Sequence, residues 1–350
     1  MSRSDRFLRA CRGLPVDATP IWIMRQAGRY LPEYRAVRSK YSFLELCRTP
    51  DAACEVTLQP VEILGVDAAI LFSDILLICD SMGCPLVLDD GGPQFPSPVR
   101  TQRDVDALIV PDPEDKLGYV MEAIRRIRRG LDGKVPLIGF CGAPWTLAAY
   151  MIEGKTSRSF EKAKELLLGD EKLAHALLSK ITDSLILYLN AQLAAGAQAL
   201  QIFDSWAGAL GPEDYARLGA PYIQRLIAGL KRDPANPQPV IVFGVETGEL
   251  LGQLSQTGAD VVGVDWRVPL SHARARTGAK VALQGNLDPA SLFLPRDVLE
   301  ARVHRVLQEA KLAGGGHIFN LGHGITPGAP VEGAKALVEI VHRGLPANAR

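Results

Sequence analysis

The feature that most restricts the fold of this chain is a series of eight short apolar runs that alternate with helical patterns. The runs are 20–24, 66–73, 136–141, 199–204, 240–245, 261–265, 281–285 and 317–321. Strands without polar alternation are typical of a parallel sheet covered by helices, and eight is the number that closes a (β/α)8 barrel. A doubly wound open sheet is the alternative.

The glycines of the chain argue against the doubly wound alternative. No Gly-x-Gly-x-x-Gly fingerprint follows any apolar run, since Gly322-His323-Gly324 meets Pro327 where a third glycine would belong. A helix expected over 295–313 begins with a proline and has Gly314 just past its end. We therefore expect an α/β protein that is a (β/α)8 TIM barrel, with an active-site cleft at the carboxyl ends of its strands.

No linker or second domain interrupts this pattern. We expect one barrel domain over 1–350, in which residues 1–15 form a flexible or helical amino-terminal extension. Residues 79–98, rich in glycine and proline, predict an inserted hairpin or loop on the second β/α connection.

Composition limits the partners and the compartment. The 350 residues contain 39 basic and 39 acidic side chains, whereas a nucleic-acid binder needs a broad basic surface, so we expect no nucleic-acid partner. No apolar run approaches the roughly 18 to 20 residues that span a bilayer, and the amino-terminal residues lack the apolar stretch of a signal peptide. Six cysteines without a Cys-x-x-Cys pair fit a reducing compartment. These features predict a cytoplasmic protein without membrane association.

Basic side chains are concentrated directly after the first apolar run. Arg25 and Arg29 flank Gly28, which allows the backbone to turn tightly and to approach a ligand closely. A guanidinium matches carboxylate or phosphate oxygens two at a time, so this pair predicts a clamp for an anion. Arg35 and Arg38 are more simply explained as a solvated helix face.

Polar side chains also stand at the ends of most other runs, where a barrel places its active site. They are Asp74, Asp204, Ser205, Asp265, Asn286 and His323, and Tyr150 lies in the helical pattern after the third run. We expect Asp204 and Asp265 to be helix caps or loop hydrogen-bonders, and Asn286 to be a turn former. Asp74 has apolar neighbours on both sides, so its charge requires a cationic partner or an array of N–H donors.

Together these residues closely resemble the uroporphyrinogen decarboxylase family. The stretches that carry the resemblance are 24–33 (MRQAGRYLPE), 67–76 (DAAILFSDIL), 142–147 (GAPWTL), 203–208 (FDSWAG), 284–289 (QGNLDP) and 320–325 (NLGHGI). The resemblance implies a homodimeric barrel that converts uroporphyrinogen III to coproporphyrinogen III in haem biosynthesis by removing four acetate carboxyls. It implies no metal and no organic cofactor.

The resemblance also implies site residues by match. The residues that fall on the family's substrate contacts are Arg25, Gln26, Ala27, Gly28, Arg29, Asp74, Tyr150, Ser205 and His323. Asp74 falls on the family's central aspartate, and we expect Asp74 and Arg25 to be the catalytic residues. The chain departs from the family at Glu246, where a lysine or other polar residue is usual.

The implied reaction explains why these residue types are needed. Loss of carbon dioxide from an acetate on a pyrrole leaves an electron pair, and a protonated pyrrole ring can accept it. A buried carboxylate such as Asp74 stabilises that cation. Arg25 and Arg29 orient a substrate with eight carboxylates. The proton donor remains open between Arg25, Tyr150 and a bound water, although an arginine normally stays charged.

Three other functions stay open from the sequence. Barrels that resemble this family also host zinc-dependent methyl transfer, but only Cys141 and His323 could be ligands, and zinc needs three from the protein. A non-catalytic tetrapyrrole carrier would use the same arginine clamp but would gain little from Asp74. A phosphate-binding barrel enzyme would use the glycines after the last two runs, and no other feature supports it.

Overall fold

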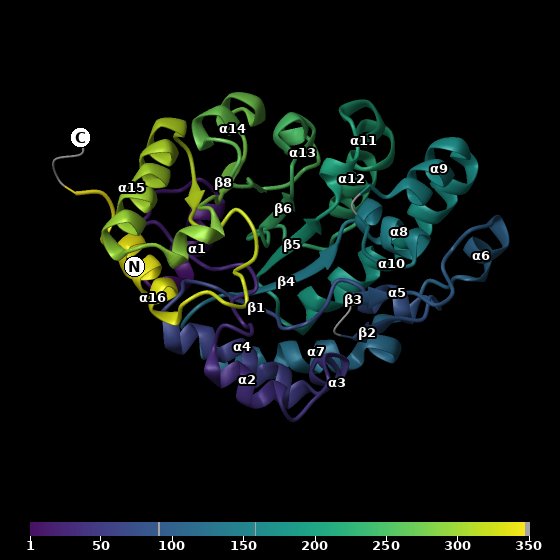
Figure 1. Ribbon diagram of the computed structural model, residues 1–350, viewed down its shortest axis with the longest axis horizontal. Helices are drawn as coiled ribbons and strands as arrows, with labels where there is room; N and C mark the ends of the chain where they lie inside the picture. The colour runs from purple at the N-terminus through teal and green to yellow at the C-terminus, as the bar shows by residue number, and fades with distance from the viewer. Residues whose placement is uncertain (90–91, 158, 347–350) are drawn as a thin grey trace.

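The computed structural model describes residues 1–89, 92–157 and 159–346. Seven parallel strands form one curled sheet in the order β1-β4-β5-β6-β7-β8-β9, and helices lie around its outside (Figure 1). The strands are β1 (Ala69–Ile70), β4 (Leu137–Gly142), β5 (Ala199–Asp204), β6 (Val240–Gly244), β7 (Val261–Gly263), β8 (Ala282–Gln284) and β9 (His317–Ile318). The predicted α/β class and parallel sheet are confirmed.

The prediction of an eighth strand over 20–24 is wrong, and the sheet is not closed by a continuous ladder. The segment lies between β9 and β1, where it makes one parallel bridge from Ile21 to Phe319 and accepts a hydrogen bond from the Asp67 N–H to the Ile21 carbonyl (2.7 Å).

Side chains take three of the N–H groups in this segment, whereas the Trp22 N–H donates to the Phe319 carbonyl (3.4 Å). The acceptors are the Asp67 carboxylate for Ile21 (2.8 Å), the Gln26 amide oxygen for Ile23 (3.1 Å) and the Asn320 amide oxygen for Met24 (3.0 Å). The apolar pattern correctly indicates that the segment is buried. It does not reveal that side-chain acceptors compete with a neighbouring strand for the backbone N–H groups.

Several other strands are shorter than their apolar runs. The run 66–73 contains only the two residues of β1, because the Phe72 N–H donates to the Thr57 hydroxyl (3.0 Å) instead of a neighbouring strand. The expected insertion at 79–98 is confirmed as an antiparallel hairpin of β2 (Val87–Asp89) and β3 (Gly92–Gln94).

The helices fill the connections between the strands. They are α1 (Arg3–Cys11), α2 (Pro32–Arg38), α3 (Phe43–Arg48), α4 (Pro50–Leu64), α5 (Leu77–Ser81), α6 (Gln102–Ala107), α7 (Pro113–Leu131), α8 (Pro144–Glu153), α9 (Glu161–Gly169), α10 (Glu171–Ala195), α11 (Pro212–Leu218), α12 (Ala220–Ala228), α13 (Leu251–Ser255), α14 (Leu270–Thr277), α15 (Arg296–Ala313) and α16 (Val331–Arg343), with single 3-10 turns at Ala207–Ala209, Gly248–Leu250 and Pro289–Phe293. Helix α15 begins one residue after the predicted start and ends where predicted, since Gly314 follows it with a φ of 64°. No helix in the described ranges is long and apolar enough to cross a bilayer.

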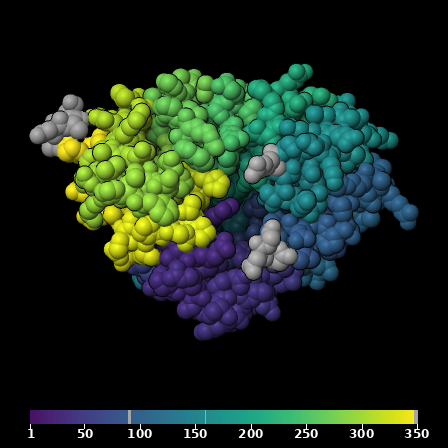
Figure 2. All heavy atoms as spheres, viewed as in Figure 1, coloured from purple at the N-terminus to yellow at the C-terminus, as the bar shows by residue number. Residues whose placement is uncertain are grey.

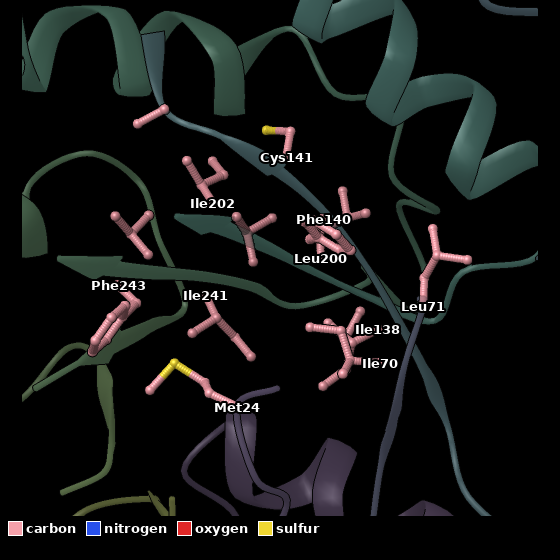
Figure 3. Close-up of a cluster of buried hydrophobic side chains, with 14 of the residues drawn as sticks. Met24, Ile70, Leu71, Ile138, Phe140, Cys141, Leu200, Ile202, Ile241 and Phe243 are labelled. Atoms are coloured by element: carbon pink, nitrogen blue, oxygen red, sulfur yellow. The ribbon is translucent and has the colours of Figure 1, made fainter. Parts of the chain in front are cut away.

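The core lies inside the curled sheet. Figure 3 shows apolar side chains from β1, β4, β5 and β6 gathered in one cluster, among them Ile70, Ile138, Leu200 and Ile241. Met24, at the end of the 20–24 segment, joins this cluster and is 3% exposed. Its burial anchors the backbone immediately before Arg25, so the core of the protein positions the first predicted site residue.

Candidate active site

The predicted site residues gather at the carboxyl ends of the strands. Asp74 lies in the loop after β1, Ser205 directly after β5 and His323 in the loop after β9, while Arg25 follows the buried 20–24 segment and Tyr150 lies in α8. We call the site formed by these five residues the central site. The face seen in Figure 2 is hollowed near its centre, and the hollow is bordered by purple and yellow atoms, the colours of the chain segments that carry Arg25 and His323.

Two glycines shape the backbone around Arg25. Arg25 has a φ of 63°, and a Cβ atom at Gly28 would lie 2.8 Å from the Arg25 carbonyl oxygen, closer than real Cβ contacts. A Cβ atom at Gly324 would lie 2.4 Å from Cδ of Arg25. The tight turn expected at Gly28 is therefore present, and Gly324 gives the Arg25 side chain room to lie against the loop after β9.

The turn after Arg25 presents backbone donors as well as guanidinium groups. The N–H groups of Ala27, Gly28 and Arg29 have no acceptor within the part of the chain that the structure describes. Consecutive free N–H groups in a turn form a concavity that suits an anion. Arg25 and Arg29 are both exposed beside it. The N–H groups therefore offer partial positive charge, and the guanidinium groups full positive charge, at the same turn.

Gln26 has a different position from its neighbours in this turn. Its side chain is fully buried, and its amide accepts from Ile23 N–H and donates to the Ala68 carbonyl (both 3.1 Å). These hydrogen bonds attach the turn to the residue before β1. The structure thus gives Gln26 a role in holding the loop, and contact with a substrate stays a prediction for this residue.

Among the described residues, Asp74 has one hydrogen-bond donor and no ion pair. Its Oδ1 accepts the N–H of Leu76 (2.8 Å), in the turn that leads into α5. Burial raises the pKa of the Asp74 carboxyl, while this hydrogen bond and the positive charge of Arg25 partly offset that rise. No lysine, arginine or histidine among the described residues lies within 4.0 Å of the carboxylate. Its charge is therefore incompletely compensated in the free protein, and a cationic ligand group would stabilise it.

Tyr150 shares the electrostatic environment of Asp74. Burial raises the pKa of its phenol, hydrogen bonding to the Trp206 indole lowers it, the Asp74 carboxylate raises it, and Arg25 lowers it. The ring packs edge-on against Trp206, with centroids 5.8 Å apart. The indole Nε1–H of Trp206 is buried beside this ring. Sequence reasoning missed Trp206, although it follows Ser205 directly.

His323 is held in its neutral form. Burial lowers the pKa of its imidazole, and the positive charges of Arg25 and Arg267 lower it further. The ring of Trp266 meets the imidazole edge-on, with centroids 6.1 Å apart. A neutral imidazole can donate one hydrogen bond to a carboxylate without carrying a charge into the site.

The aspartates that sequence reasoning assigned to structural roles have them. Asp204 is fully buried and accepts hydrogen bonds from the hydroxyls of Thr146 (2.7 Å) and Tyr215 (2.8 Å), and burial raises the pKa of its carboxyl to about 6. These bonds attach the end of β5 to α8 and α11, which fixes the backbone before Ser205.

Asp265 and Asn286 organise the loop after β7. Asp265 accepts the N–H groups of Glu246 (2.5 Å) and Arg267 (2.8 Å), and Asn286 donates to the carbonyls of Asp265 and Val268 (both 2.7 Å). The predictions of a loop hydrogen-bonder and a turn former are confirmed. Sequence reasoning did not single out Arg267, because an arginine after Asp-Trp has no local pattern that separates it from a solvated charge.

Metal ligands do not gather at this site. In the ranges that the structure describes, no group of three or more histidine, cysteine, aspartate or glutamate side chains is arranged to hold a metal ion. All six cysteines are free thiols, and Cys141 is buried in β4. The prediction that the protein needs no metal is left to experiment.

The structure is an α/β protein whose curled parallel sheet has arginines, N–H groups without an acceptor among the described residues, and a partly buried carboxylate at its strand ends. Comparison with known proteins names the family. The family model described as Uroporphyrinogen decarboxylase (URO-D) matches residues 2–344. The chain belongs to the uroporphyrinogen decarboxylase family, as the sequence motifs predicted.

Individual relatives are similar in sequence to nearly the whole chain. A protein named uroporphyrinogen decarboxylase from Myxococcus xanthus is 56% identical over 340 residues, which cover 97% of this chain and 96% of that protein. Proteins of the same name from Hahella chejuensis and Trichlorobacter lovleyi are 52% and 54% identical, covering 97% of this chain and 96% and 98% of theirs.

Solved structures support the fold alone. A methyltransferase from Methanosarcina mazei aligns with a TM-score of 0.82 at 21% identity, covering 98% of this chain and 99% of that one. A B12-independent methionine synthase from a Shewanella species aligns with a TM-score of 0.55 at 15% identity, covering 84% and 87%. At such low identity the likeness says nothing about the reaction of this chain.

Proposed function

We propose that this protein is a carboxy-lyase that removes the four acetate carboxyls of uroporphyrinogen III to give coproporphyrinogen III and carbon dioxide in haem biosynthesis. The observation that carries the proposal is the Asp74 carboxylate, which has no ion pair with any described residue and shares its surroundings with Arg25 and Tyr150. Relatives at 50 to 56% identity that carry the name of this activity support it.

Substrate binding is assigned to the turn after the 20–24 segment and to the loops around it. Arg25 and Arg29 pair with carboxylates, and the N–H groups of Ala27, Gly28 and Arg29 donate hydrogen bonds to further carboxylate oxygens. The remaining substrate contacts are assigned to Gln26, Asp74, Tyr150, Ser205 and His323. The Ser205 hydroxyl has no hydrogen-bond partner among the described residues, so it can bind a ligand group.

Asp74 performs the central electrostatic task in this mechanism, and Arg25 beside it is the second catalytic residue. A proton adds to a pyrrole carbon, and the ring becomes a cation. The bond between the acetate methylene and its carboxyl then breaks, carbon dioxide leaves, and the electron pair neutralises the ring through an exocyclic double bond. A second proton adds to the exocyclic carbon as the first leaves the ring, which yields a methyl group. The incompletely compensated charge of Asp74 stabilises the cationic stage, where it contributes most.

The proton donor is assigned to Tyr150 or to a water that it positions. The phenol lies in the electrostatic field of Asp74 and carries its proton at neutral pH because burial raises its pKa. Burial and two arginines lower the pKa of His323, so its imidazole is not assigned as the proton donor at neutral pH. Arg25 keeps its charge in ordinary protein sites and serves orientation and charge pairing.

The finer features predicted from the sequence belong to the same proposal. The 20–24 segment takes the place of the eighth strand in a (β/α)8 barrel architecture of one domain over 1–350. The family resemblance supports a homodimer, a cytoplasmic location and a reaction without metal or organic cofactor. A tetrapyrrole is the proposed small-molecule partner, and neither nucleic acid nor a membrane is proposed as one.

The proposal is tested by incubating the purified protein anaerobically with uroporphyrinogen III and separating the oxidised products by their number of carboxyls. We expect conversion from the octacarboxylate to the tetracarboxylate. Coproporphyrinogen III serves as the control substrate and should remain unchanged. Unaltered uroporphyrinogen in the presence of folded protein would refute the proposed function.

A further inference from the structure

We propose that Arg267, in the loop after β7, is a further substrate-binding residue that receives a carboxylate of the polyanionic substrate, and that Glu246 occupies its guanidinium in the free protein. This inference rests on the proposed function, because it names a second anchoring point for the same substrate. It concerns residues that the sequence motifs did not assign to the site.

The backbone of Arg267 is fixed at the carboxyl end of the sheet. Asp265 is 2% exposed, and its carboxylate accepts the Arg267 backbone N–H (2.8 Å) and contacts Nη1 of the same residue (3.4 Å). Asp265 also accepts the Glu246 N–H. One buried carboxylate therefore holds both members of the Arg267–Glu246 pair at the strand ends.

Aromatic contacts connect Arg267 to the central site. The guanidinium carbon lies 4.0 Å from the centroid of the Trp266 ring, a distance typical of a cation–π contact. Trp266 in turn meets His323 edge-on at 6.1 Å. Arg267, Trp266 and His323 are thus joined by successive side-chain contacts, from the loop after β7 to a predicted substrate contact.

Electrostatics agree with this placement. The positive charges of Arg25 and Arg267 both lower the pKa of the His323 imidazole. Both guanidinium groups therefore lie near enough to act on the same ring. A substrate with carboxylates around its edge would meet two cationic anchors beside His323, one from each of two loops.

Glu246 is placed as a removable counterion. Its Oε1 lies 3.0 Å from Nη2 of Arg267, and the side chains are 59% and 42% exposed, so solvent screens the pair and its contribution to stability is small. The Glu246 backbone is held by Asp265 and has a φ of 60°, but the exposed side chain can rotate away. A guanidinium has five N–H donors, and two contacts leave others for an incoming carboxylate.

The same part of the chain supplies a matched control. Arg276 pairs with Glu249 at 2.9 Å, and its side chain is 41% exposed, close to the value for Arg267. Its guanidinium also donates to the Gly248 carbonyl. No aromatic ring contact of Arg276 is recorded among the described residues, and its charge is not one of those that act on His323. If Arg267 were only a surface ion-pair residue, the two pairs would respond alike.

The test measures binding of uroporphyrin, the stable oxidised octacarboxylate, by fluorescence, together with KM and kcat for uroporphyrinogen. We expect Arg267→Gln to raise Kd and KM about tenfold with kcat within threefold of wild type, on the scale of one lost charged hydrogen bond. Glu246→Gln should lower Kd severalfold, since it removes the competing carboxylate. Arg276→Gln and Glu249→Gln should change neither value.

The two variants of the pair must respond in opposite directions, and misfolding cannot produce that result. Unchanged Kd in Arg267→Gln, or weaker binding in Glu246→Gln with an unchanged melting temperature, would overturn the inference. Equal changes in Kd in Arg276→Gln and Glu249→Gln would also overturn the inference. If wild-type protein binds uroporphyrin but does not decarboxylate uroporphyrinogen, the proposed function fails, and the binding data still decide the role of Arg267.

Discussion

Replacing Asp74 by asparagine separates a catalytic carboxylate from a structural one. The asparagine oxygen can still accept the Leu76 N–H, so the turn before α5 keeps its hydrogen bond. Only the charge is lost. Losing one preorganised electrostatic group typically costs about 2.7 to 4 kcal/mol of transition-state stabilisation, so kcat should fall by a factor on the order of 100 to 1,000.

The same substitution should not destabilise the protein. Burial raises the pKa of Asp74, which means that folding disfavours its charged form. A carboxyl with a raised folded pKa lowers the free energy of unfolding as the pH rises above its unfolded pKa, and the loss is complete above its folded pKa; asparagine removes that penalty. At neutral pH Asp74→Asn should therefore be as stable as wild type or more stable, with uroporphyrin binding within about threefold, because the loss of one charge contact is confined to the cationic stage.

The assay combines turnover, binding and thermal unfolding of the same preparations. Wild-type kcat should also fall as the pH drops through the raised pKa of Asp74. The residual kcat of Asp74→Asn should not show this decrease at acidic pH. Asp74→Glu keeps the charge one methylene away and should retain more activity than asparagine. Wild-type kcat in Asp74→Asn would show that the carboxylate only caps the turn. Unfolding of that variant would show that it has a buried cationic partner.

Three further predictions concern neighbouring residues. Arg29→Ala should raise KM about tenfold or more with a smaller effect on kcat, since an exposed guanidinium contacts carboxylates in ground and transition states alike and a charged hydrogen bond is worth about 1.5 to 3 kcal/mol; an unchanged KM would contradict this. His323→Asn should leave substantial turnover, and complete inactivation of folded protein would make His323 the general acid or base. Asp67→Ala should lower the free energy of unfolding by about 3 to 5 kcal/mol in denaturant melts, because Asp67 is fully buried and pairs with Arg6 (2.9 Å). The exposed partner of Arg6 is the control, and Asp17→Ala should cost less than about 1 kcal/mol; equal losses in both variants would refute the distinction.

The parallel sheet was predictable because burial on both faces leaves a simple signal. The run 199–204 became β5 without change, and the proline and glycine around α15 located that helix within one residue. The run 20–24 is equally apolar but forms no strand, since Asp67, Gln26 and Asn320 take the N–H groups of Ile21, Ile23 and Met24. Two of these acceptors lie far away in the sequence, and apolar periodicity carries no information about such contacts.

The candidate site was also only partly predictable from the sequence. Arg25, Arg29 and Gly28 form a local pattern with a steric reason, and the structure contains the close approach that Gly28 permits. The contact of Glu246 with Arg267 joins two loops, and each residue on its own resembles an ordinary surface charge. Trp206 was missed for the same reason, because its importance lies in the ring contact with Tyr150.

The most direct test of the account is the fate of the carboxyl carbons. Uroporphyrinogen III labelled with 13C in its acetate carboxyls would be incubated anaerobically with the protein in buffer containing EDTA and no added cofactor. The account predicts four equivalents of labelled carbon dioxide per substrate, a coproporphyrinogen product without label, and no change when zinc is added. Retention of the label, or release of carbon dioxide only after zinc or a cofactor is supplied, would contradict the account.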